Sequence, residues 1–277
     1  MASTAIHTIS NRHFEAYREK LVHTHRREIL QISAKKPAVT MTPPHIHIEP
    51  TDINMNWKTD YRSFYYEGAA EPSDLSLPTH ETALLSIDVQ NTYMTPSDSP
   101  VERARWAPFH KRMHEIVIPA TAELQNRFRQ HEMAVLHARI ACLLESGKDR
   151  SLSQKKPGWN YLLLPKDKED AQIVPELAPR EDEIVVTKTT DSALTGTNLR
   201  LVLHNMGIKN VVLTGIFTDQ CISSTVRSLA DESFNVILVE DCCAAGTDEL
   251  HRKELEILNM IYCHVISSEE LMNFMGM

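Results

Sequence analysis

From residue 82 onward the chain alternates short apolar runs with segments of helical spacing. The runs are rich in Val, Ile and Leu and lie at 83–89, 133–140, 183–188, 210–216, 235–241 and, more weakly, 263–268. A run without polar alternation is typical of a strand that is buried on both faces. Helical spacing appears between the runs, near 108–130, 196–206, 219–233 and 248–260. The alternation predicts an α/β fold of three layers, in which helices cover a doubly wound, mostly parallel sheet.

Residues 1–80 differ from this pattern and predict an N-terminal extension to a domain at 81–277. The extension is rich in His and Pro, and apolar spacings of three and four between about 13 and 33 favour an amphipathic helix. It ends in an aromatic run of Tyr61, Phe64, Tyr65 and Tyr66. Four aromatic side chains so close together usually cover something. We therefore expect the extension either to pack on its own domain or to serve as an oligomerisation arm.

Charge and apolar patterning exclude several classes of partner. The formal net charge of −8 in 277 residues gives no basic surface for nucleic acid or for an anionic membrane. No apolar run approaches the roughly 20 residues that span a bilayer, and the first 30 residues lack the apolar stretch of a signal peptide. The five cysteines are odd in number and irregularly spaced, which favours reduced thiols. These features predict a cytoplasmic protein without a nucleic-acid or membrane partner.

Three residues that carry chemistry lie where predicted strands end. Asp88 ends the first run, Lys188 ends the third, and Cys221 follows the fourth. Ligands of open parallel sheets bind outside the carboxyl ends of the strands. Taken singly, these residues would be interpreted as a helix cap, a solvated charge and a small buried side chain. Their combination at one predicted edge indicates a reactive site.

The motifs around these residues resemble those of the isochorismatase-like cysteine hydrolases. They are LLSIDVQNTYM at 84–94, VVTKTTDSALTGT at 185–197 and TGIFTDQC at 214–221. The resemblance covers about residues 80–270 and includes N-carbamoylsarcosine amidohydrolase, biuret hydrolase and nicotinamidase. It implies an isochorismatase-like fold, a homodimer or homotetramer, and a cis peptide bond that would map to Ile216-Phe217.

The resemblance also implies a catalytic triad of Asp88, Lys188 and Cys221. Cys221 would be the nucleophile, with its pKa lowered by a helix N-terminus and by the ammonium of Lys188. Asp88 would accept the thiol proton and later return it to the departing amine. Backbone N–H groups of Phe217 and Cys221 would form the oxyanion hole.

Departures from individual relatives narrow the predicted reaction. Nicotinamidases carry an Asp-x-His metal signature after the second strand, whereas this chain has VLHARIACLLESGKD with His137 alone. His45 and His47 share one face of an extended segment, which we regard as a weak metal site at most. We therefore expect no metal and no cofactor. Isochorismatases proper cleave a vinyl ether without the cysteine, so Cys221 favours a small amide, ureide or carbamoyl substrate.

Candidates for substrate binding lie near the ends of the predicted strands. Gln90 and Tyr93 follow the first strand, Arg139 ends the second, and Trp159 lies in the loop before the third. An arginine in the pocket would bind a carboxylate through two hydrogen bonds, but Arg139 could equally form a surface ion pair.

Two other functions remain open at this stage. One is an isochorismatase-type ether hydrolase, which would tolerate loss of Cys221. The other is an inactive relative that acts as a binding or scaffold protein through its extension. A single cysteine that is alkylated much faster than the other four would favour the enzyme.

Overall fold

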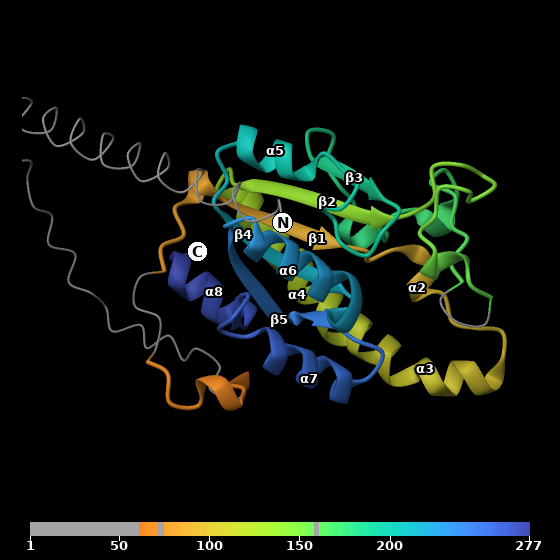
Figure 1. Ribbon diagram of the computed structural model, residues 1–277, viewed down its shortest axis with the longest axis horizontal. Coiled ribbons are helices and arrows are strands. Elements are labelled where there is room, and N and C mark those ends of the chain that lie inside the picture. Colours follow the sequence, from red (N-terminus) through yellow and green to blue (C-terminus); the bar gives the residue numbers. More distant parts are fainter. Residues whose placement is uncertain (1–60, 71–74, 158–160) are drawn as a thin grey trace, which may run out of the picture. The chain divides into compact units, whose positions relative to one another are not determined.

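The computed structural model describes residues 61–70, 75–157 and 161–277. The predicted helix at 13–33, His45, His47 and Trp159 lie outside these residues. Six strands form one sheet in the order β3-β2-β1-β4-β5-β6, and every neighbouring pair is parallel (Figure 1). The strands are β1 (Thr82–Ile87), β2 (Ala134–Ile140), β3 (Ile184–Lys188), β4 (Asn210–Ile216), β5 (Asn235–Ala244) and β6 (His264–Ile266).

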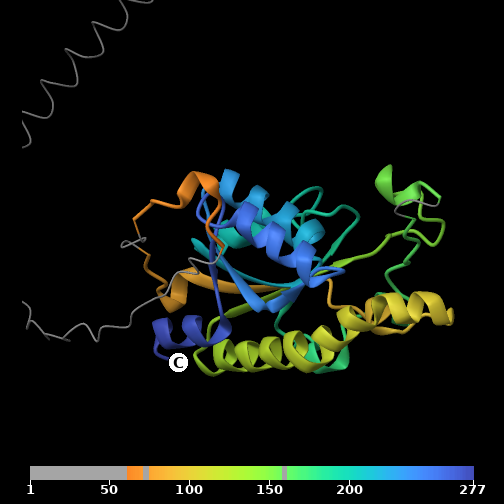
Figure 2. The ribbon, with the colours of Figure 1, turned by 90° about the horizontal axis from the view of Figure 1, so that it is seen from below.

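Helices cover both faces of the sheet, which confirms the predicted three-layer α/β fold. On one face lie α5 (Leu199–Asn205), α6 (Ser223–Asp231) and α7 (Asp248–Leu258), whose buried residues join one large apolar cluster with the strands. On the other lie α4 (Ile118–Gln130) and α8 (Ser268–Met275), which pack into a second cluster. Figure 2 shows the two layers on opposite sides of the strands.

The helical segment before β2 is longer than the sequence predicted. It starts with α3 (Pro100–Arg112), passes through a π-helical turn at Met113–Val117 and continues as α4. Ser99 caps α3 by accepting a hydrogen bond from the Glu102 N–H. A short helix, α2 (Asn91–Met94), follows β1. Short 3-10 turns occupy residues 64–66, 79–81, 153–155, 169–171 and 175–177.

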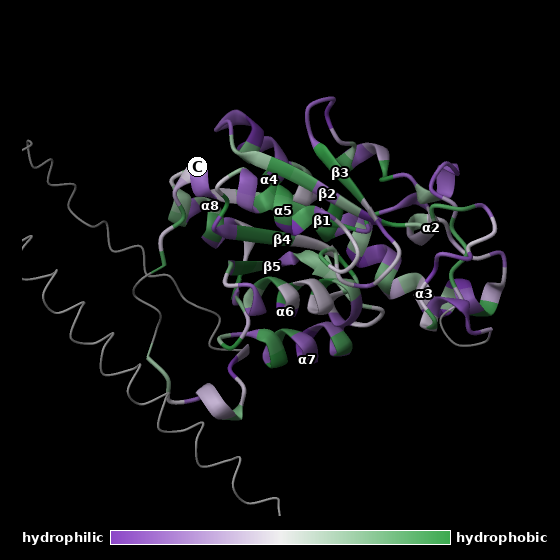
Figure 3. Cartoon of the chain, turned by 45° about the horizontal axis from the view of Figure 1, so that its top comes forward, coloured by the Kyte–Doolittle hydropathy of each residue, from purple (hydrophilic) through white to green (hydrophobic). Residues whose placement is uncertain are grey.

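Burial along the strands follows their place in the sheet. Every residue of the central strands β1 and β4 is buried, which explains why their sequences lack polar alternation. The edge strand β3 instead exposes Ile184 and Val185. Figure 3 shows the apolar colouring concentrated on the strands and on the helix faces turned toward them.

The aromatic run before β1 divides between burial and exposure. Tyr61 is buried in the larger cluster, its hydroxyl donates to Glu240 at 2.6 Å, and its carbonyl accepts from the Asn259 amide at 3.2 Å. Phe64 and Tyr65 are 81% and 83% exposed. Thus Tyr61 packs on its own domain, whereas Phe64 and Tyr65 are not covered within this chain. Among the described helices, none is long and apolar enough to span a membrane.

Candidate active site

The three chemistry-bearing residues meet at the carboxyl edge of the sheet. The Lys188 ammonium donates to Asp88 Oδ2 at 2.7 Å and to Cys221 Sγ at 3.3 Å. It also donates to the Thr190 carbonyl at 3.1 Å, which fixes the loop after β3. All three side chains are buried, Lys188 completely. Residues separated by as much as 133 positions therefore form one cluster, as the strand-end argument predicted.

The backbone conformation at Asp88 directs its side chain toward Lys188 and Cys221. Asp88 follows β1 with a φ of 57°, in the left-handed region that few residues other than glycine adopt. Its N–H donates to the Ala138 carbonyl at 2.9 Å, which holds this conformation against β2. On the other side, Gly215 has a φ of 120°, and a Cβ there would lie 2.0 Å from the Ile87 carbonyl oxygen. Only glycine allows β4 to approach the end of β1 this closely.

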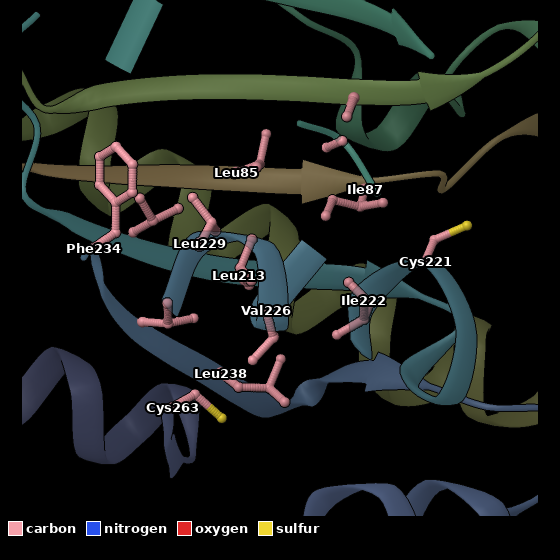
Figure 4. Packing of buried hydrophobic residues seen from close by; sticks show 14 of the residues in the cluster. Leu85, Ile87, Leu213, Cys221, Ile222, Val226, Leu229, Phe234, Leu238 and Cys263 are labelled. Carbon is pink, nitrogen blue, oxygen red and sulfur yellow. The ribbon is translucent and has the colours of Figure 1, made fainter. Parts of the chain in front are cut away.

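A tight turn places the thiol beyond the end of β4. The Ile216-Phe217 peptide bond is cis, as the resemblance implied. A π-helical turn at Thr218–Ile222 follows and leads into α6. In Figure 4, Ile222 and Val226 face the sheet while the Cys221 sulfur points away from their cluster. The N–H groups of Gln220 and Ile222 both donate to the Phe217 carbonyl, so these bonds hold the turn without using the N–H of Phe217 or of Cys221.

The electrostatics of the thiol differ from the sequence expectation. Burial raises the pKa of Cys221 well above its usual value, and the carboxylates of Asp88 and Asp191 add to this effect. Lys188 opposes it but does not outweigh it. The expected lowered pKa is therefore wrong, because the sequence revealed the cation but neither the depth of burial nor the second carboxylate. A protonated thiol needs a base before it can attack.

Asp88 has the properties of such a base. Burial raises the pKa of its carboxyl, and Lys188 offsets this only in part. One oxygen, Oδ2, is bound by Lys188, while the buried Oδ1 has no hydrogen-bond partner among the described residues. Burial would lower the pKa of Lys188, but Asp88 and Cys221 raise it instead, so this side chain stays a cation. An unpaired carboxylate oxygen beside a protonated thiol is suited to accept its proton.

Asp191 is part of the site, although the sequence did not single it out. Its Oδ1 accepts a hydrogen bond from the Cys221 thiol, with 3.9 Å between oxygen and sulfur, and the residue is half-buried. The residue is three positions after Lys188 and thus at the same edge of the sheet. That position was the available signal, but an isolated Asp in a loop is usually a turn residue.

Two of the predicted substrate contacts instead have structural partners. The fully buried Gln90 amide donates to the carbonyls of Ile140 and Ala171 and accepts from the Ile140 N–H at 2.9 Å. Gln90 therefore ties the end of β1 to β2. Arg139 is on the face of β2 opposite to Ile140, which packs in the Cys221 cluster, and donates to Gln172 at 2.5 Å. Both side chains thus have hydrogen-bond partners within the protein, and their contact with substrate stays a prediction.

Tyr93, another predicted substrate contact, lies near Asp88, Cys221 and Asp191. Its pKa is raised by burial and by the nearby charges of Asp88, Cys221 and Asp191. Its ring contacts Phe217 edge-on, with centroids 5.4 Å apart. Both rings, with Trp106 and Phe109, line a pocket of about 270 Å³.

Metal ligands are not gathered in the described part of the chain. No group of three or more His, Cys, Asp or Glu side chains is arranged there to hold a metal ion. His137 is buried on β2 and is hydrogen-bonded through Nε2 to Glu183 at 2.9 Å. It is thus engaged with a carboxylate, in keeping with its interpretation as a structural residue.

Comparisons with known proteins agree with the fold and the motifs. The isochorismatase domain model matches residues 82–270. A ureidoacrylate amidohydrolase RutB from Acinetobacter baylyi is 26% identical over 74% of this chain and 87% of its own length. A RutB from Azorhizobium caulinodans is 30% identical over 66% of this chain and 85% of its own length. The structure of a cysteine hydrolase from Pseudomonas syringae pv. phaseolicola superposes with a TM-score of 0.63 at 18% identity, covering 75% of this chain and 98% of that one.

The family match spans most of the described domain, and the parallel sheet carries the reactive cluster at its carboxyl edge. These features define a hydrolase with the isochorismatase-like fold. The chain belongs to the isochorismatase family, within the isochorismatase-like cysteine hydrolase superfamily.

Proposed function

We propose that this chain hydrolyses a small amide, ureide or carbamoyl compound through a thioester on Cys221 and releases ammonia or an amine. The observation that carries the proposal is that only one of the two carboxylate oxygens of Asp88 has a hydrogen-bond partner among the described residues. Lys188 holds Oδ2, while Oδ1 is buried without a described partner near the thiol. The amidohydrolase activity of the RutB relatives points in the same direction.

In the first half of the reaction, Asp88 Oδ1 takes the proton of the Cys221 thiol, and the sulfur forms a bond to the substrate carbonyl carbon. The carbonyl electron pair moves to its oxygen, where the N–H groups of Phe217 and Cys221 would stabilise the oxyanion. When the pair returns, the C–N bond breaks and Asp88 gives its proton to the leaving nitrogen. Lys188 stays a cation throughout and stabilises the negative charge on sulfur and carboxylate.

In the second half, water replaces the released amine. Asp88 takes a proton from the water, whose oxygen attacks the thioester carbon, and the C–S bond then breaks. The departing thiolate recovers the proton from Asp88, so the site returns to its starting state. One buried carboxylate thus acts as base and acid in turn.

Ammonia release from a panel of small amides, ureas and carbamoyl compounds tests the proposal. We expect turnover of at least one compound, and a loss of several orders of magnitude in Cys221→Ala with the fold intact. Mass spectrometry of the wild-type protein during turnover should detect the acyl or carbamoyl group on Cys221. Near-wild-type ammonia release in Cys221→Ala would show that the reaction does not pass through a thioester on Cys221. A panel without any turnover, together with an unreactive Cys221, would support the inactive relative.

A further inference from the structure

Asp191 lies beside the nucleophile without a part in the chemistry described above. Its Oδ1 is 3.9 Å from Cys221 Sγ, and its charge acts on Tyr93 as well as on the thiol. Asp88 is buried and held by Lys188, whereas Asp191 is half-buried and so keeps contact with solvent. Of the two carboxylates, Asp191 is therefore the more accessible to solvent.

Hydrogen bonds on both sides of Asp191 fix the loop that carries it. Before it, the Thr190 carbonyl accepts from Lys188 at 3.1 Å. After it, the Ser192 hydroxyl bonds to Ser228 at 2.9 Å and the Ala193 N–H donates to Thr225 at 3.0 Å. Because Thr225 and Ser228 belong to α6, the loop is tied to the same helix that follows Cys221. This bracing keeps the carboxylate at a defined position relative to the thiol.

The two cations at the carboxyl ends of β2 and β3 already have partners. Lys188 is completely buried and is shared among Asp88, Cys221 and Thr190. Arg139 is engaged with Gln172 on the other face of β2. Lys188 and Asp191 are thus the two charged groups whose contacts with the Cys221 sulfur are described.

We infer that Asp191 determines the charge of the substrates that reach Cys221. Its carboxylate favours compounds that present an N–H donor or a positive charge beside the scissile carbonyl, such as neutral ureas, amides and cationic amides. It repels compounds with a carboxylate at that place. For substrates, this inference rests on the proposed amide hydrolysis. It also separates the chain from its RutB relatives, because an acrylate carries a carboxylate.

Alkylation of Cys221 by two probes of similar size tests this selectivity without a known substrate. Iodoacetamide is neutral and iodoacetate is an anion, and both react with the same thiolate. The ratio of their rates therefore cancels any change in thiolate fraction. Each rate is measured at Cys221 by peptide mapping and divided by the rate with free cysteine. We expect wild-type protein to favour iodoacetamide, and Asp191→Asn to reduce that preference about tenfold at low ionic strength.

Asp231→Asn is the matched control, because it removes the same charge from the exposed C-terminal end of α6. It should leave the rate ratio at the wild-type value. An unchanged ratio in Asp191→Asn, or an equal change in the control, would overturn the inference. If the Asn variant does not fold, Asp191→Ser removes the charge with a smaller side chain and is judged by the same ratio.

Ammonia release separates this inference from the proposed function. Asp191→Asn should improve turnover of carboxylated ureas relative to neutral ones. If the panel gives no turnover but the alkylation ratio changes as expected, amide hydrolysis fails and the charge selectivity of Asp191 stands. If neutral amides turn over but the ratio does not change, the selectivity fails and the hydrolysis stands.

Discussion

The side chains of Glu183 and Asp88 are both buried carboxylates that pair with a cation, but they differ in how many of their oxygens are hydrogen-bonded. Glu183 uses both oxygens: Arg129 donates to them at 2.7 and 2.9 Å, and His137 and the Arg180 N–H bond to Oε2. Asp88 receives Lys188 on Oδ2 but leaves the buried Oδ1 without a described partner.

The pKa values follow this difference. Burial alone would raise the pKa of Glu183, but the hydrogen bonds from Arg129, Arg180 and His137 outweigh it and lower the pKa to about 2. Burial does raise the pKa of Asp88, because Lys188, with smaller contributions from Cys221 and the Ile140 backbone, offsets it only in part. A saturated carboxylate is a weak base that holds strands together, whereas an unsaturated one is able to take a proton. Hydrogen-bond saturation therefore distinguishes a structural ion pair from a reactive one here.

Asp88→Asn should have the largest effect on turnover among the substitutions that test this comparison. The amide keeps the shape of the side chain but cannot accept and return a proton. We expect turnover to fall by about 10²–10⁴-fold, with circular dichroism unchanged. The matched variant Glu183→Gln should retain its turnover per folded molecule. Asp88→Asn with more than a tenth of wild-type turnover would show that the unpaired oxygen is not the base.

Lys188→Met should reduce turnover and also change the titration of the thiol. Lys188 is the group that lowers the pKa of Cys221, so its removal raises that pKa further. The pH profile of Cys221 alkylation by iodoacetamide should accordingly move to higher pH. A profile identical to that of wild type would mean that Lys188 serves only to hold Asp88.

The strands that carry this site could be predicted from the sequence, whereas the hydrogen-bond partners and pKa values of its side chains could not. Central strands such as β1 and β4 are buried on both faces, and this leaves a pattern that can be read directly. The capped helix α8 was missed, although Ser267 and Glu270 form a capping box that the sequence contains. The hydrogen-bond partners of Gln90 and Arg139 could not be predicted, because position along a strand does not reveal them. The raised pKa of Cys221 depends on burial and on Asp191, and both require the tertiary structure.

Glu183→Gln should lower the stability of the fold, whereas Asp88→Asn should lower turnover. Glu183 is 8% exposed, and the amide would leave Arg129 without its ion pair. We expect the free energy of unfolding at pH 7 to fall by about 3 kcal/mol, measured by urea denaturation. Because the pKa of Glu183 is lowered on folding, its stabilisation is present above pH 4.5 and is lost as the pH falls toward about 2. The difference between variant and wild type should therefore shrink in that window, and a constant difference would contradict the pKa assignment.

The smallest expected effect concerns the pH dependence of stability and comes from His251. This residue is hydrogen-bonded to Thr218 in the turn that holds Cys221. Arg112 has only donors, so Nε2 of His251 accepts from it at 3.0 Å, and Nδ1–H donates to Thr218 at 2.8 Å. Burial and the charge of Arg112 lower the pKa of His251 to about 4. The folded state therefore resists protonation, and stability is lost as the pH falls from 6.5 toward 4.

We expect the wild-type protein to lose about 2 kcal/mol between pH 7.5 and pH 5 through His251. His251→Asn keeps a donor for Thr218 and should flatten the profile in this range, whereas His131→Asn removes an exposed histidine and should not. This window lies above that of Glu183, so urea denaturation at a series of pH values resolves the two. An identical pH profile in His251→Asn and wild type would mean that the histidine is already charged in the folded protein. In that case Nε2 could not accept from Arg112, and the described support of the cysteine turn would be wrong.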